Sequence, residues 1–421
     1  SPLCGLCGLS VESWRLAVAD KQRQFEWDGS ETTAEVFSYA HQLGPRDAGI
    51  EARVVPLSRE ECQALVTMHR GRYPSVLLPE VSETEIEEAK CFVDTIKKRV
   101  DELLHGSGRW FVKTNRHSCK DAPPTEADAA LFRLELQNRQ LAQPLPKGTN
   151  PDEIDFGPAF EAFLAARLQG MVVTSGESAV ELVVRSPRAH DDLQLQLELE
   201  TDHFDCYLAF FPFDDCTSPL HEFRCFVTGR QVRCVAQYQY LHRCPIADAD
   251  MPSAVVSIAD YVRLRVLPTL PDNILDVAVD LRCLRVDELW EIDLIELNPL
   301  GPGCVWGVMD WKSDKDWLLG RAPPPQPEEV RDSVGGALRS LLVPGPGPDC
   351  PPVVARFTSQ HPLGLTMGGL AHMGNEMLLV LFTAWDVERV IRDHDAETKL
   401  DRAAVQKKGA SGTTQDWCTL C

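Results

Sequence analysis

Two neighbouring apolar segments that carry acidic side chains constrain the fold of this chain more than any other feature. Residues 274–284 read ILDVAVDLRCL and residues 289–299 read LWEIDLIELNP, each typical of a strand in a large core. Side chains alternate between the faces of a strand, so Glu296 and Asn298 share a face with Ile292 and Leu294, roughly 7 Å apart from each other. A buried carboxylate needs a positive partner, and a hard cation such as Mg²⁺ suits this pair of oxygen-bearing side chains.

The preceding segment supplies further carboxylates. Asp276 and Asp280 share one strand face, so either could lie opposite Glu296 if the two strands form a hairpin. Mg²⁺ usually takes one or two protein carboxylates and obtains its other oxygens from water and nucleotide phosphates. A magnesium-nucleotide site is one interpretation. A plain hairpin, in which the acids meet arginines or solvent, explains these two strands equally well.

Two upstream segments carry cations on predicted strands. Lys113 lies in RWFVKTN, residues 109–115, where a flexible ammonium could reach a phosphate. Arg224 lies in HEFRCFV and shares a strand face with Glu222, so it could bind phosphate or form an internal ion pair with that acid. Each signal is weak alone because lysine often extends from a strand edge.

The order of these segments resembles the ATP-grasp fold and, more closely, the cell-division-cycle 123 family of ATP-grasp proteins. The matching stretches follow family order across about residues 50–303: VVPLSREECQALV, LLPE, FVKTNRHSCKDA, VVTSGESAVELVVRSPRAHDDL, HEFRCFVTGRQVRCVAQYQY, DVAVDLRC and LIELNPLG. The resemblance implies an α+β fold with two α+β lobes and ATP between them.

The resemblance also implies a function, which is an ATP- and Mg²⁺-binding assembly chaperone for translation initiation factor 2 that acts on its gamma subunit. By position, Lys113 and Arg224 contact the nucleotide. Asp276, Glu296 and Asn298 hold Mg²⁺, and Asp280 remains an alternative to Asp276 because the hairpin between Asp276 and Glu296 is longer than usual.

The chain departs from the family pattern at two places. Tyr238-Gln239 stands where the family commonly has Arg-Asp, which removes a cation from the phosphate region, and Glu296 stands where the family has Asp. Two further functions therefore stay open. One is an ATP-grasp ligase that joins a carboxylate to an amine through an acylphosphate, and the other is a decayed nucleotide fold kept as a scaffold.

Two local signals predict where elements begin or turn. Ser82-Glu83-Thr84-Glu85 is a capping box that predicts the start of a helix running to about Leu104, and Gly229 predicts the turn of a hairpin over residues 222–240.

Composition limits the partners and the compartment. A formal net charge of −21 predicts no nucleic-acid partner, because such proteins cluster Lys and Arg, and it would also repel an anionic carboxylate substrate. No stretch reaches the roughly 20 apolar residues that cross a bilayer, and SPLCGLCGLSVESW lacks the basic start of a secretion signal. We expect a cytoplasmic monomer.

The chain divides by composition at residue 321. Residues 1–321 form the predicted ATP-grasp domain, and residues 322–421 hold proline-rich linkers, a small accessory segment and a disordered tail. Cysteine pairs stand near both ends of the chain, Cys4 with Cys7 and Cys418 with Cys421. They could bind a metal or remain free thiols, and Cys418 also fits the loose pattern for a prenylated cysteine.

Overall fold

The computed structural model describes residues 52–386, apart from residues 75–78, 106–107, 115–116, 148, 151–153, 156, 199–203, 214–217, 240–241, 302–308, 310, 326–337, 348–349 and 360–373. The predicted cysteine pairs at residues 4, 7, 418 and 421 lie outside the described residues. The described cysteines are all free. No helix in the described part of the chain is long and apolar enough to span a membrane.

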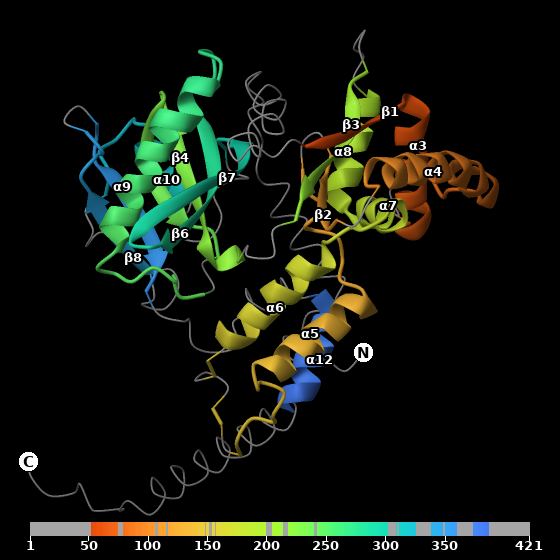
Figure 1. The fold of residues 1–421 in the computed structure, drawn as a ribbon, viewed down its shortest axis with the longest axis horizontal. Helices are drawn as coiled ribbons and strands as arrows, with labels where there is room; N and C mark the ends of the chain where they lie inside the picture. Colours follow the sequence, from red (N-terminus) through yellow and green to blue (C-terminus); the bar gives the residue numbers. More distant parts are fainter. Residues whose placement is uncertain are drawn as a thin grey trace, which may run out of the picture.

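The first lobe is built on a small antiparallel sheet. Strands β1 (Arg53–Leu57), β3 (Cys206–Pro212) and β2 (Trp110–Lys113) lie in the order β1-β3-β2. Helices pack on this sheet in the right half of Figure 1 and bury one apolar core with it. They are α3 (Arg59–Arg72), α4 (Glu83–Leu103), α7 (Gly176–Arg185) and α8 (Pro187–Glu198).

Helix α4 begins directly after Ser82, which is its N-cap residue. The Ser82 side chain accepts from the Glu85 amide, and Glu85 accepts from the Ser82 amide, which is the capping box expected from the sequence. Helix α7 begins beside α4 at Gly176. A Cβ at that glycine would lie 2.0 Å from the Lys97 carbonyl oxygen, so only glycine permits the approach of these helices.

The second lobe is a six-stranded sheet in the order β7-β6-β4-β5-β9-β8. Neighbouring strands are antiparallel except for the parallel pair β5 and β9. The strands are β4 (Glu222–Thr228), β5 (Gln231–Gln237), β6 (Val277–Val286), β7 (Leu289–Pro299), β8 (Leu338–Val343) and β9 (Val353–Thr358). Gly229 and Arg230 have φ of 57° and 59°, so the β4–β5 hairpin turns at the predicted glycine with both central residues left-handed.

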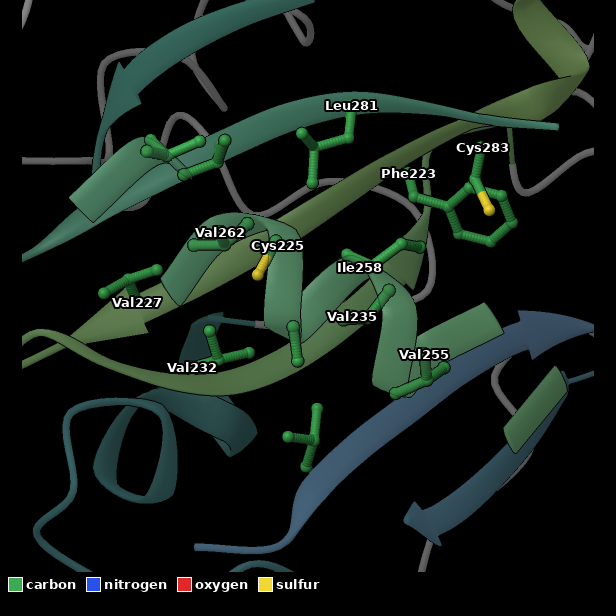
Figure 2. Close-up of a cluster of buried hydrophobic side chains, with 14 of the residues drawn as sticks. Phe223, Cys225, Val227, Val232, Val235, Val255, Ile258, Val262, Leu281 and Cys283 are labelled. Atoms are coloured by element: carbon green, nitrogen blue, oxygen red, sulfur yellow. The ribbon is translucent and has the colours of Figure 1, made fainter. Parts of the chain in front are cut away.

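Each face of the second sheet is covered by a helix. Helix α9 (Met251–Tyr261) continues through a short π-helix (Val262–Val266) and a 3₁₀ turn (Leu267–Thr269) across one face. Figure 2 shows Val255, Ile258 and Val262 of this segment over the apolar side chains of β4, β5 and β6. Helix α10 (Trp311–Leu318) packs on part of the opposite face, where Trp317 and Leu318 meet apolar side chains of β4, β5 and β9.

The sheet continues past residue 321, the boundary predicted for the first domain. Strand β9 is fully buried and lies between β5 and β8, and Phe357 belongs to the core beneath α9. On the other face, Arg356 donates to both carboxylate oxygens of Asp314 on α10, at 2.6 and 2.9 Å. Strands β8 and β9 are therefore an integral part of the second lobe.

A helical unit connects the two lobes. Helices α5 (Glu126–Asn138) and α6 (Gly157–Gly170) pack against α12 (Gly374–Trp385) around one apolar cluster, and all three lie below the lobes in Figure 1. Helix α12 is fixed by hydrogen bonds to the segment after α5. Trp385 Nε1 donates to the Leu141 carbonyl oxygen at 2.9 Å.

The observed class is α+β, as predicted. An antiparallel three-stranded sheet and a mainly antiparallel six-stranded sheet form separate cores, and helices cover both.

Candidate functional site

A row of charged side chains crosses three strands of the second sheet. Arg224 on β4 lies opposite Asp280 on β6, which in turn lies opposite Glu296 on β7. Arg224 Nε and Nη2 each donate to an Asp280 oxygen at 2.6 Å, a geometry that gives strong and directional bonds. Asn298 Nδ2 donates to Asp280 Oδ2 at 3.0 Å, so the four side chains form one polar surface.

A β-bulge in β7 lies beside Glu296, the acid that this strand contributes to the surface. Asp280 pairs with Glu296, but the next residue Leu281 pairs with Leu294, so Ile295 is the extra residue on β7. Leu294 consequently packs in the core beneath α9, together with Leu297. The prediction that Leu294 shares a face with Glu296 is wrong, because simple alternation does not hold across a bulge.

Lys113 joins the first lobe to this surface. It is the last residue of β2, where the side chain leaves the three-stranded sheet. Its Nζ donates to Glu296 Oε2 at 2.9 Å, and the two side chains are only 17% and 11% exposed. Two residues that are 183 positions apart in the sequence thus meet between the lobes.

A second lysine, which the sequence analysis did not single out, also reaches the second lobe. Lys120 follows β2 in the stretch FVKTNRHSCKDA, and its Nζ donates to the Tyr238 hydroxyl at 2.8 Å. The Tyr238 ring lies 4.9 Å from Lys120 Nζ and 4.9 Å from Arg224 Cζ. An aromatic face stabilises both cations, so Tyr238 organises the positive charge of Lys120 and Arg224.

The protonation states follow from this arrangement. Burial by itself raises the pKa of Glu296, but Lys113, Lys120 and Arg224 hold that pKa well below its ordinary value. Burial also lowers the pKa of Lys120, but Tyr238 and the nearby acids Glu296, Asp280 and Glu222 raise it above its ordinary value. Both groups therefore stay charged at neutral pH.

The pKa of Glu222 shifts in the opposite direction from that of Glu296. Burial raises its pKa from 4.5 to about 7, and the neighbouring carboxylates Asp280 and Glu296 add to the effect, while Lys120 and Arg224 oppose it. Glu222 precedes Arg224 by two residues on β4 and lies opposite Arg282 of β6. Glu222 is therefore poised to change its charge near neutral pH.

Asp276 lies apart from the cluster. It is exposed, precedes β6, and its Oδ1 accepts from the Gly229 amide at 2.8 Å, so it supports the turn of the β4–β5 hairpin. Asp280 occupies the position opposite Glu296. The structure thus places the alternative, Asp280, beside Glu296 and Asn298, and it assigns Asp276 a different role.

The donor set of this cluster fits a hard cation. Asp280 and Glu296 supply two carboxylates on adjacent strands, and Asn298 supplies an amide on the same surface. Among the described residues, no group of three or more His, Cys, Asp or Glu side chains forms a metal cage. Mg²⁺ does not require one, because it commonly uses one or two carboxylates together with substrate phosphates.

Comparisons with known proteins give structural relatives only. No family model matches the chain, and no curated protein matches it in sequence. Cdc123 from Schizosaccharomyces pombe is similar in structure, with a TM-score of 0.38, 14% identity, and coverage of 68% of this chain and 92% of that one. The C-terminally truncated form of the same protein gives a TM-score of 0.40 and 17% identity, over 66% of this chain and 89% of that one. Both are structures of the family that the sequence motifs resemble.

Proposed function

We propose that the chain binds Mg-ATP between its two lobes, in the arrangement of an ATP-grasp protein. The contact between Lys113 and Glu296 carries this proposal. It brings an ammonium group that could bind phosphate, on one sheet, to a carboxylate that could bind a metal ion, on the other sheet. Around it stand the cations Lys120 and Arg224 and the acid Asp280.

The charges of this cluster suit a nucleotide and a metal that bind together. Without ligand, each cation has a polar or acidic partner within the protein. With Mg-ATP, the phosphates would pair with Lys113, Lys120 and Arg224, and the metal would take Asp280, Glu296 and Asn298. Bound Mg²⁺ would neutralise charge on the phosphates and the acids. We therefore expect ATP and Mg²⁺ to bind much more weakly alone than together.

Calorimetry with Mg-ATP tests this site. Glu296→Ala should weaken binding about 10- to 100-fold, as expected for the loss of a metal ligand and of the partner of Lys113. Glu291→Ala is the matched control, because Glu291 is exposed on the same strand and should bind as wild type does. Equal heats for wild type and Glu296→Ala would remove nucleotide binding from this surface.

The biological role that we propose is assembly of translation initiation factor 2 through its gamma subunit, by a cytoplasmic monomer. The ordered motifs across residues 50–303 support this role, and the net charge of −21 suits a basic protein partner. Purified chain immobilised on beads should retain the gamma subunit. Failure to retain it, under conditions in which an established family member does, would contradict the role.

Phosphate release separates the chaperone from a ligase. A ligase that forms an acylphosphate should release phosphate only when both a carboxylate and an amine acceptor are present. We expect no such acceptor-dependent release from the chain with Mg-ATP. Release that requires both acceptors would favour the ligase over the chaperone.

A further inference from the structure

The two lysines of the site belong to one loop that is held in place by buried contacts. We call Lys113, Thr114 and residues 117–122 the lysine loop. It closes on itself at its start, where Lys113 forms an isolated bridge with Ser118 and the Thr114 amide donates to the His117 carbonyl at 3.0 Å. These contacts fix the local turn, but they do not fix it relative to the rest of the lobe.

Asp192 of α8 fixes the start of the lysine loop. Its carboxylate accepts from the Thr114 hydroxyl, lies 3.1 Å from the His117 amide nitrogen, and lies 2.6 Å from His117 Nδ1. Asp192 is 5% exposed and Thr114 is 2% exposed. A carboxylate this buried makes strong bonds, and its removal leaves several polar groups of the loop without their acceptor.

The end of the lysine loop is held from two sides. Asp121 accepts from the Ser186 hydroxyl at 2.6 Å and the Arg188 amide at 2.8 Å, where α8 begins. Arg167 of α6 donates to the carbonyl oxygens of Lys120 and Ala122, at 3.1 and 2.8 Å. Lys120 therefore extends toward Tyr238 from a backbone that is bonded on either side of it.

We propose that Asp192 is a positioning residue of the nucleotide site, which sets the separation of the Lys113 and Lys120 ammonium groups to match a bound triphosphate. This inference rests on the proposed function. Asp192 contacts neither ammonium in the structure, and it acts through Thr114 and His117. Helix α8 then serves as the rigid support of both phosphate-binding cations, since its N-terminus holds Asp121 and its second turn holds Thr114 and His117.

Titration with Mg-ATP and with magnesium tripolyphosphate tests the inference on the full chain. Asp192→Ala should weaken binding of both at least tenfold. Asp192→Asn keeps an oxygen that can accept from Thr114 but lacks the negative charge. Its affinity for both probes should lie between that of wild type and that of Asp192→Ala. Thr114→Val removes one of the bonds without a change in shape and provides a second variant if Asp192→Ala does not fold.

Leu193→Ala is the matched control for a merely structural effect. Leu193 is the next residue of α8, is 2% exposed and packs in the core of the first lobe, so its loss destabilises the lobe without a change to the lysine loop. We expect wild-type affinity from Leu193→Ala at a temperature at which both variants are folded.

Three results are distinguishable. The inference is supported if Asp192→Ala loses affinity for both probes, Asp192→Asn recovers part of that affinity, and Leu193→Ala keeps the wild-type affinity. Equal affinity for wild type and Asp192→Ala, or an equal loss in Asp192→Ala and Leu193→Ala, overturns it while the proposed function stands. A wild-type chain that binds neither probe overturns the proposed function and this inference with it.

Discussion

The first lobe contributes lysines to the charged cluster and the second lobe contributes mainly acids, and the two lobes hold these side chains in different ways. The first lobe supplies Lys113 and Lys120 from a strand end and a loop, which hydrogen bonds to side chains of α6 and α8 fix in place. The second lobe supplies Arg224, Asp280 and Glu296 from adjacent strands, where the sheet register fixes them. The acidic side is therefore as rigid as the sheet, whereas the basic side depends on a few polar contacts.

The largest expected effect concerns the strands that complete the second lobe. Truncation after residue 321 removes β8, β9 and α12, and with them the core residues Val343, Val353, Ala355 and Phe357. Each such loss costs about 1–5 kcal/mol, against about 5–15 kcal/mol for the stability of a whole domain. The second lobe should unfold, and limited proteolysis should cut within residues 222–299.

A shorter truncation serves as the control. A chain that ends at residue 386 keeps every described element and should resist proteolysis as the full chain does. A truncation at 321 that remained resistant in both lobes would contradict the assignment of β8 and β9 to the second sheet.

The next effect separates the two candidate aspartates of the second lobe. Asp280→Ala leaves the largely buried Arg224 without its carboxylate and should lower the free energy of unfolding by about 3–5 kcal/mol. Asp276→Ala removes one exposed bond to the Gly229 amide and should cost about 1 kcal/mol. Urea unfolding of the two variants checks this order. Equal costs, or a larger cost at Asp276, would mean that Asp280 is not the buried partner of Arg224.

A smaller effect concerns pH and Glu222. Its pKa rises from the ordinary value of 4.5, which applies to the unfolded chain, to about 7 in the folded chain. Between pH 4.5 and pH 7, the folded state therefore binds more protons than the unfolded state. The free energy of unfolding contributed by this group therefore falls as the pH rises from about 4.5 to 7, and is constant above that. One pKa unit corresponds to about 1.4 kcal/mol, so the slope is measurable.

Glu222→Gln should remove that slope. Urea unfolding of wild type and variant at pH 5, 6, 7 and 8 gives the difference between them, which cancels the contribution of the other carboxylates. Wild type should lose stability relative to the variant as the pH rises to about 7. A difference that stays constant over this range would show that Glu222 titrates normally.

The smallest effect concerns the contact that joins Lys120 of the first lobe to Tyr238 of the second. Tyr238→Phe removes the hydroxyl that accepts from Lys120, but it keeps the ring beside Lys120 and Arg224. The free energy of unfolding should fall by about 1 kcal/mol. A loss of more than about 3 kcal/mol would mean that the hydroxyl, and not the ring, organises these cations.

Local signals predicted much of the fold. The capping box at Ser82 and Glu85 gave the start of α4, and the glycine at 229 gave the β4–β5 turn, because both depend on neighbouring residues alone. Helix α8 was not predicted, since LQLQLE at 193–198 alternates as a strand does. Strands β8 and β9 follow proline-rich segments, and β9 enters the sheet by pairing with the distant strand β5.

The sequence indicates the types of residue in the candidate site better than it indicates which individual residues meet there. The family resemblance places Lys113 and Glu296 near one nucleotide, and in the structure the two side chains form an ion pair. The position of Asp280, in place of Asp276, depends on strand register and on the bulge at Ile295, which local alternation does not encode. Lys120 lies in a loop without periodicity, and a second lysine in FVKTNRHSCKDA was the one signal for it.

Hydrogen exchange with and without Mg-ATP tests the central claim most directly, because it reports on both lobes in one experiment. The account predicts that Mg-ATP slows exchange in residues 111–122 of the first lobe and in residues 278–298 of the second. Slower exchange in one lobe alone, or in neither, would contradict a nucleotide site that the two lobes share.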